Sequence, residues 1–127
     1  MSTEEMMFFN QWPQLLPLYE TLRDKLCAAY PDVKIKVAKT QVSFYNRHMF
    51  AMASLPVRRR KEWPSSYLMV SFGLGIPIAS PRIAAKVEAY PGRWTHHVLI
   101  EHEDQLDGEL FGWLDEAYRF ALAKRGH

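Results

Sequence analysis

The spacing of the hydrophobic residues changes twice along this chain, and this change constrains the fold more than any other feature. Near the start, apolar side chains recur every three or four positions, which predicts a helix that buries one face and ends by Pro31: Leu15, Leu18, Leu22, Leu26 and Ala29. The same period returns near the end of the chain, in Leu106, Leu110, Trp113, Leu114, Ala117 and Ala121. Between these helices, Val33, Ile35 and Val37 alternate with lysines, which is typical of a strand with one buried face.

Further strands fit the patterns of residues 41–45, 48–55, 67–74, 84–90 and 94–101. Pro91 and Gly92 join the last two and suit the central positions of a type II turn, so we predict an antiparallel hairpin. The other connections are too short for parallel crossovers. The sequence therefore predicts a single α+β domain over residues 1–127: a two-layer α-β(6)-α sandwich, mainly antiparallel, with both long helices on one face. The other face is then solvated, paired with a second subunit or occupied by a ligand.

Composition narrows the classes of partner and the compartment. The net charge of +2 is too small to indicate a nucleic-acid or membrane partner by itself. Cys27 is the only cysteine, so no intrachain disulfide forms. The first residues carry acids where a signal peptide would carry bases, and no apolar run reaches the roughly 18 residues that cross a bilayer. We expect a cytoplasmic protein with no membrane partner.

Charge is nevertheless unevenly placed along the chain. Residues 34–61 contain eight Lys or Arg and no acid, whereas residues 101–116 contain seven acids and no Lys or Arg. The acids suit the positive N-terminus of the last helix. The basic segment is either a solvated face or a surface for an anionic partner, and arginines beside aromatic residues can hold phosphates and stack bases. Its candidate ligand-binding residues are Arg47, Arg58, Arg59, Arg60 and Lys61.

The stretch RWTHHVLI, residues 93–100, contains two adjacent histidines that a strand would place on opposite faces. They therefore cannot chelate one metal together. His96 shares its face with apolar residues, so we expect it to be buried under the helices and hydrogen-bonded. His97 is expected on the uncovered face, where it and Arg93 are the candidates in this strand to touch a bound molecule.

Catalytic patterns are missing from the sequence. Ser43, Ser54 and Ser71 lie in strand patterns without a nucleophile elbow, and the GLG at residues 73–75 does not open a helix that could bind phosphate. We predict no catalytic residues, no metal ligands and no cofactor.

The sequence thus favours a binding domain over an enzyme, with an unidentified anionic small molecule or macromolecule as ligand. One alternative is a nucleic-acid-associated accessory domain that uses residues 34–61. Another is an enzyme or metal-handling protein that uses the histidine strand 93–102. A homo-oligomer also stays open.

Two longer stretches carry a resemblance to a known family: KVAKTQVSFYNRHMFA and RWTHHVLIEHEDQLDGELFGWLDEAYRFA. The chain resembles, over residues 15–121, an uncharacterised bacterial domain-of-unknown-function family, five-six-five-five, whose members are often labelled predicted transport protein. That family is distantly similar to frataxin-like iron chaperone domains, which share the order helix, sheet, helix. The resemblance implies a fold, and it implies no activity and no site residues.

Overall fold

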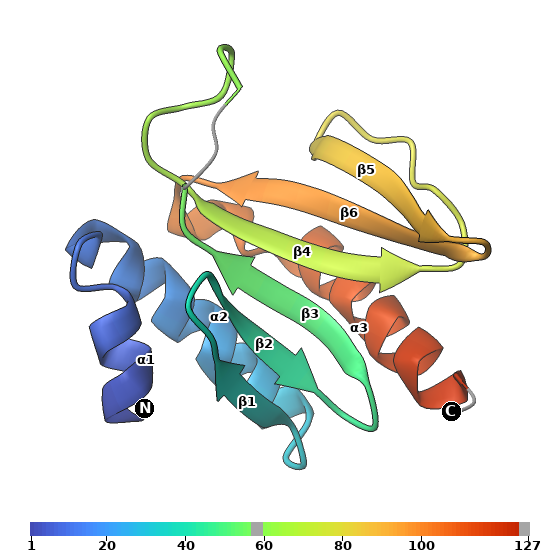
Figure 1. Ribbon diagram of the computed structural model, residues 1–127, viewed down its shortest axis with the longest axis horizontal. Helices are drawn as coiled ribbons and strands as arrows, with labels where there is room; N and C mark the ends of the chain where they lie inside the picture. Colours follow the sequence, from blue (N-terminus) through green and yellow to red (C-terminus); the bar gives the residue numbers. More distant parts are fainter. Residues whose placement is uncertain (57–59, 125–127) are drawn as a thin grey trace.

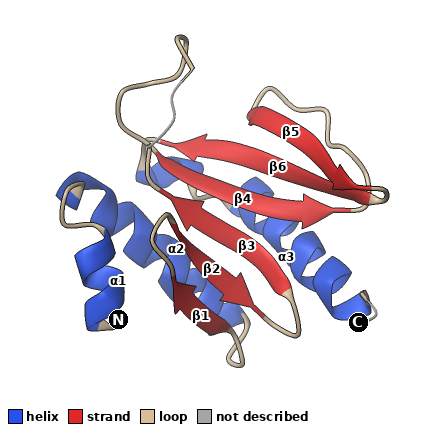
Figure 2. Cartoon of the chain, in the orientation of Figure 1, coloured by secondary structure: helices blue, strands red, loops and turns tan. Residues whose placement is uncertain are grey.

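The computed structural model describes residues 1–56 and 60–124 of the chain. Its elements follow in the predicted order of helix, strands and helix (Figure 1): α1 (Thr3–Phe8), η1 (Pro13–Leu15), α2 (Leu16–Ala29), β1 (Lys34–Val37), β2 (Gln41–Tyr45), β3 (Met49–Ser54), β4 (Leu68–Leu74), β5 (Ile83–Tyr90), β6 (Arg93–Ile100), η2 (Glu103–Gln105) and α3 (Gly108–Ala123). Both long helices, α2 and α3, lie behind one face of the sheet, and no helix of the described residues lies on the other face (Figure 2). The predicted α+β sandwich is therefore confirmed.

The sheet has six antiparallel strands in the order β1-β2-β3-β4-β6-β5. The chain leaves β4, passes to the edge to form β5, and returns through the Pro91-Gly92 turn to place β6 between them. Gly92 has a φ of 84°, which its missing side chain permits, and the predicted hairpin is confirmed. The strands begin and end within two residues of the predicted ranges.

The core lies between the helices and the covered face of the sheet. From the predicted first helix it receives Leu15, Leu18, Leu22 and Leu26, whereas Ala29 is exposed in the last turn. The sheet contributes alternate residues of its strands, because only every second side chain points toward the helices. These include Val42, Phe44, Ala51, Ala53, Val70, Phe72, Val98 and Ile100.

The N-terminal segment is fixed to α2 by a buried carboxylate. Ser2 and Glu5 form a capping box at α1, and Glu5 also accepts hydrogen bonds from the Tyr19 hydroxyl and, at 2.7 Å, from Nε of Arg23. Burial favours the neutral acid, but the hydrogen bonds from Tyr19, Ser2 and Arg23 outweigh it and hold the pKa of Glu5 below its usual value. Glu5, only 2% exposed, is thus an ionised internal anchor.

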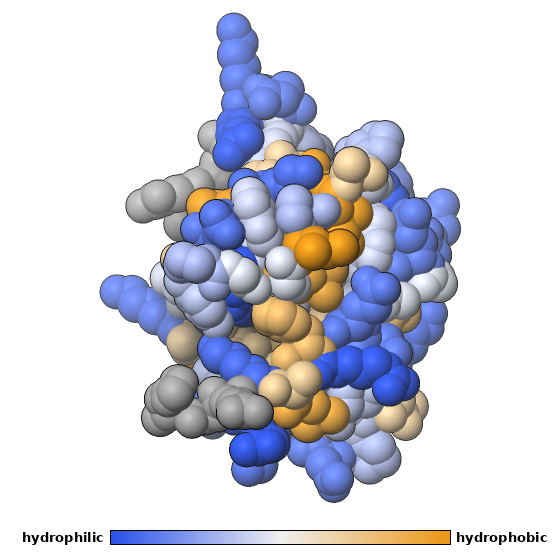
Figure 3. Space-filling view, turned by 90° about the vertical axis from the view of Figure 1, so that its right-hand side faces the viewer, coloured by the Kyte–Doolittle hydropathy of each residue, from blue (hydrophilic) through white to orange (hydrophobic). Residues whose placement is uncertain are grey.

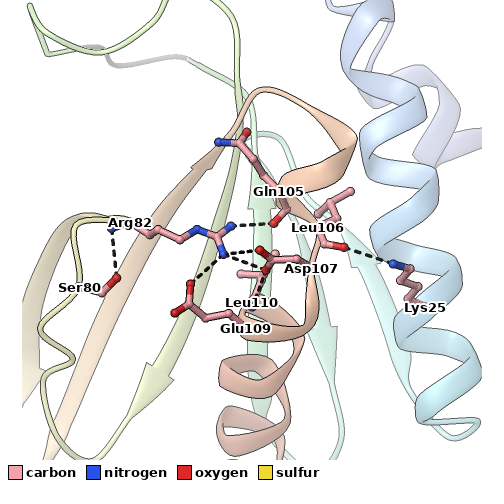
Figure 4. Close-up of polar contacts among 8 residues, drawn as sticks. All are labelled: Lys25, Ser80, Arg82, Gln105, Leu106, Asp107, Glu109 and Leu110. Atoms are coloured by element: carbon pink, nitrogen blue, oxygen red, sulfur yellow. Dashed lines mark hydrogen bonds and ion pairs between the residues drawn. The ribbon is translucent and has the colours of Figure 1, made fainter.

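The long connection from β4 to β5 is fixed at the start of α3 (Figure 4). Asp107 caps that helix by accepting from the Leu110 N–H at 3.0 Å, and Arg82 donates to the same carboxylate at 2.8 Å. Arg82 also donates to Glu109 at 3.1 Å and to the Gln105 carbonyl at 2.7 Å. Each nitrogen at the outer end of this guanidinium therefore has a partner, and the arginine has a structural role.

Candidate functional site

His96 is fully buried on the helix-covered face, as predicted. Its ring stacks on Phe72 with centroids 5.2 Å apart, and its Nε2 accepts a hydrogen bond from the Ile78 N–H at 3.0 Å. Within residues 1–56 and 60–124, its Nδ1 finds no hydrogen-bond partner. Burial lowers the pKa of His96, so the ring is neutral at pH 7 and holds the connection that contains Ile78 against the core.

His97 lies on the uncovered face and is partly buried, which confirms its predicted face. Its Nδ1 is 2.7 Å from Oγ of Ser71 in the neighbouring strand. Burial lowers the pKa of His97, and the positive charge of Arg60 acts in the same direction. Ser71 is itself only 1% exposed, so its hydroxyl is not accessible to a substrate. The contact between Ser71 and His97 therefore joins β4 to β6.

Arg93 lies on the same face, near the end of the sheet. Its Nη1 donates to Oγ1 of Thr95 at 3.0 Å, and its guanidinium lies over Gly73 of β4. A Cβ atom at position 73 would stand 2.6 Å from Nη2 of Arg93, so only glycine leaves this space open. Gly73 is the first glycine of the GLG motif, and its missing side chain leaves space for the guanidinium of Arg93.

Arg47 comes from the tight turn between β2 and β3. Asn46 fixes this turn twice: its Oδ1 accepts from the His48 N–H at 3.0 Å, and its Nδ2 donates to the Tyr118 carbonyl of α3 at 2.9 Å. The turn is therefore attached to the second half of α3, and Arg47 is presented there as an exposed cation.

Arg47 and Arg93 line the same cavity, which we call the sheet-end cavity. The pairing of β3 with β4 ends at Ala51 with Phe72, and the two strands diverge beyond that pair (Figure 1). The cavity lies in this opening and has a volume of about 350 Å³. Its lining consists of basic, aromatic and small or apolar residues: Arg47, His48, Arg93 and Lys124; Tyr45, Tyr90 and Phe120; Met49, Gly73, Ala117 and Ala121.

The electrostatics of the sheet-end cavity are one-sided. Its lining includes no Asp or Glu, and the rings of two lining tyrosines each attract a lysine. Nζ of Lys124 is 5.0 Å from the centroid of Tyr90, and Nζ of Lys36 is 5.3 Å from that of Tyr45. Nε2 of His48 is buried and, among the described residues, has no hydrogen-bond partner. The arrangement is suited to holding an anion.

Two other candidate binding residues of the basic segment lie away from the sheet-end cavity. Arg60 and Lys61 are exposed, as expected, in the loop at the opposite end of β3 from Arg47. Arg60 lies 5.2 Å from the ring centroid of Trp63. Arg58 and Arg59 fall outside the described residues. The described candidates of this segment are therefore divided between the two ends of β3, and His97 does not line the sheet-end cavity.

Sequence reasoning identified Arg47 and Arg93 singly and missed Lys124, His48, Tyr45 and Tyr90. The cavity is built from four segments that are distant in the sequence, and no local pattern links them. One available signal was the GLG motif, because a glycine inside a strand often marks a close approach of another group.

The described residues lack both a cluster of metal ligands and a helix long and apolar enough to span a membrane. Within residues 1–56 and 60–124 there is no group of three or more His, Cys, Asp or Glu side chains placed to hold a metal ion. Over the same residues, every helix is too short or too polar to cross a membrane.

Comparison with known proteins supports the resemblance noted in the sequence. No curated protein and no solved structure matches the chain significantly. The model of one family, described as "Domain of unknown function (DUF5655)", matches residues 5–121. This range includes the whole sheet and, apart from Lys124, all of the residues that line the sheet-end cavity. The chain therefore belongs to the family "Domain of unknown function (DUF5655)".

Proposed function

We propose that this chain is a binding domain that holds a small anion in the sheet-end cavity, and that it does not transform its ligand. The observation that carries this proposal is the meeting of Arg47, Arg93 and Lys124 around one cavity whose lining has no acid. These residues come from the β2–β3 turn, the β5–β6 hairpin and the end of α3.

The charge balance of the cavity supports an anionic ligand. Among the described residues, Arg47, Arg93 and Lys124 form no ion pair with a carboxylate. Like charges held close together repel one another, and the repulsion is relieved when an anion enters. Arginine binds carboxylates and phosphates through two parallel N–H donors, which gives both charge and direction.

The position of Arg93 supports a prepared site. Its guanidinium rests on Gly73 and is held by the Thr95 hydroxyl, so part of its freedom is already lost before a ligand binds. A side chain that is fixed in advance loses less entropy on binding. The lining supplies positive charge, hydrogen-bond donors and aromatic surface, which favour binding of a ligand. It supplies no Asp or Glu that could act as a catalytic acid or base.

A titration with inorganic phosphate, followed by NMR chemical shifts, tests the proposal. The double variant Arg47→Gln/Arg93→Gln should bind phosphate at least tenfold more weakly, since a hydrogen bond to a charged group contributes about 1.5–3 kcal/mol. The matched control is Arg60→Gln/Lys61→Gln, which removes the same charge from the loop at the other end of β3. Equal weakening by both pairs would contradict the proposal, and loss by the control alone would move the site to that loop.

A further inference from the structure

A second cavity adjoins the sheet-end cavity and differs from it in chemistry. It has a volume of about 450 Å³ and is lined by Leu74, Gly75, Ile76, Ile78, Glu116, Arg119 and Phe120. Phe120 lines both cavities, so its ring stands at the boundary between them. We call this second space the apolar cavity, because leucine, isoleucine and phenylalanine make up its interior.

The two cavities follow one another along the same two walls. On β4 and its continuation, Gly73 lines the sheet-end cavity, and the next two residues line the apolar cavity. On α3, Ala117 and Ala121 face the former, and Glu116 and Arg119 face the latter. Figure 3, which views this end of the molecule, shows a band of apolar side chains bordered by hydrophilic ones.

We propose that the ligand of this chain is an amphipathic anion, whose carboxylate or phosphate head occupies the sheet-end cavity and whose apolar tail lies in the apolar cavity. This inference rests on the proposed function, because the head is held by Arg47 and Arg93. Charge complementarity fixes the direction of the ligand. The sheet-end cavity has basic residues and no acid in its lining, whereas the apolar cavity has one acid, Glu116, and one base, Arg119, whose Nε already pairs with Asp115 at 2.9 Å.

The exposure of the apolar cavity supports an occupant of this kind. Ile76 is 70% exposed at its wall, so a large apolar side chain faces water until something covers it. Gly75 lets Phe120 pack closely against the chain after β4: a Cβ at this position would stand 3.2 Å from a ring carbon of Phe120 and press on that ring. A tail that extends from the sheet-end cavity past Phe120 would lie against this ring and the exposed Ile76 side chain.

The tail is tested with four probes, each titrated below its aggregation concentration: acetate, inorganic phosphate, decanoate and decyl phosphate. Decanoate should bind at least tenfold more tightly than acetate, and decyl phosphate at least tenfold more tightly than phosphate. Whichever of decanoate and decyl phosphate binds more tightly identifies the preferred head, because their tails are equal. Decanol, which has the tail without the charge, should bind more weakly than decanoate.

Two variants locate the tail. Ile76→Ser should bring decanoate close to the affinity of acetate and leave acetate and phosphate unchanged. Met7→Ser is the matched control, because Met7 is a comparably exposed apolar residue, at 61%, in α1. It should leave decanoate binding as it is. Equal weakening by both variants would show general adsorption to exposed apolar side chains and would overturn the inference.

The outcomes separate the inference from the proposed function. If acetate and phosphate bind through Arg47 and Arg93 but decanoate is no tighter than acetate, the amphipathic ligand is wrong and the anion site stands. If decanoate binds and Arg47→Gln/Arg93→Gln does not weaken it, the head is misplaced and the inference fails. If none of the four anions binds, both proposals fail.

Discussion

The two ends of α3 hold arginines in opposite circumstances. At the N-terminal end, Arg82 is paired with Asp107 and Glu109 and with a backbone carbonyl. At the C-terminal end, Arg47 and Arg93 line a cavity and, among the described residues, form no ion pair. At the N-terminal end, the charge of Arg82 fixes the β4–β5 connection to α3. The C-terminal end leaves its charge available, and this contrast is the reason for placing the ligand there.

Removal of Arg82 should have the largest effect on stability. Arg82→Gln loses the ion pairs with Asp107 and Glu109, and because these acids are partly exposed we expect a loss of about 1–2 kcal/mol of unfolding free energy. Urea denaturation measures this. Arg93→Gln should change stability by less than about 0.5 kcal/mol, since no carboxylate is left unpaired. An equal loss for the two variants would remove the distinction between the ends.

Gly73→Ala should weaken anion binding at the sheet-end cavity without lowering the stability of the fold. The added Cβ would stand 2.6 Å from Nη2 of Arg93, so the flexible guanidinium must move away while the strand stays in place. We expect phosphate binding to weaken about tenfold with little change in melting temperature. Gly112→Ala is the control, because nothing lies within 4 Å of a Cβ at this helical position. Phosphate affinity that survives Gly73→Ala would mean that Arg93 need not lie over β4.

Acid should lower the unfolding free energy, because His96, which holds the β4–β5 connection at Ile78, and His97 are both neutral in the fold. Burial lowers the pKa of His96 and His97 below 6.5, so both histidines bind protons more readily in the unfolded chain. Their contribution to stability is therefore complete above about pH 6.5 and declines as the pH falls, by at most about 1.4 kcal/mol per pH unit for each group.

Unfolding free energies at pH 7.5, 6.5 and 5.5 measure this decline. Glu5, Asp107 and Asp115 have lowered pKa values and lose their contribution only at lower pH, outside this range. His97→Gln should keep the part of the decline that comes from His96. Stability that rises between pH 6.5 and 5.5 would contradict the assignment.

The smallest effect is expected in the loop at the far end of β3. Arg60 and Lys61 are exposed, and among the described residues they form no ion pair. Arg60→Ser/Lys61→Ser should therefore shift the unfolding free energy by only about 0.5 kcal/mol. Differential scanning calorimetry checks this. A large fall in melting temperature would show that the contact of Arg60 with Trp63 supports the fold.

Much of the fold could be predicted because local spacing determines it. The alternation around Ile35 and the helical stripe from Leu106 each describe one element and need no distant partner. The strand order could not be predicted, because the placement of β6 between β4 and β5 depends on pairing between residues far apart in the sequence. His96 and His97 were assigned to the correct faces because strand geometry places them on opposite faces and the apolar residues beside His96 mark the covered one.

The candidate site could be predicted only in part. Arg47 and Arg93 were named for their charge, but their meeting depends on the Asn46 contact with α3 and on the divergence of β3 from β4. His97 was grouped with Arg93 because both share a face. They are four positions apart along the strand, about 13 Å, and only Arg93 lines the cavity. Lys124 was missed, because its position beside Tyr90 is a tertiary feature.

The most direct test observes the arginines of both ends in one sample. NMR spectra of the arginine side-chain Nε–H groups, recorded during a phosphate titration, report each guanidinium separately. We expect the Arg47 and Arg93 signals to shift together and saturate with one dissociation constant. The Arg82 signal should stay in place, because both outer nitrogens of that guanidinium are already bonded. Shifts of Arg82 equal to those of Arg93, or a titration in which Arg47 and Arg93 do not move, would contradict this expectation.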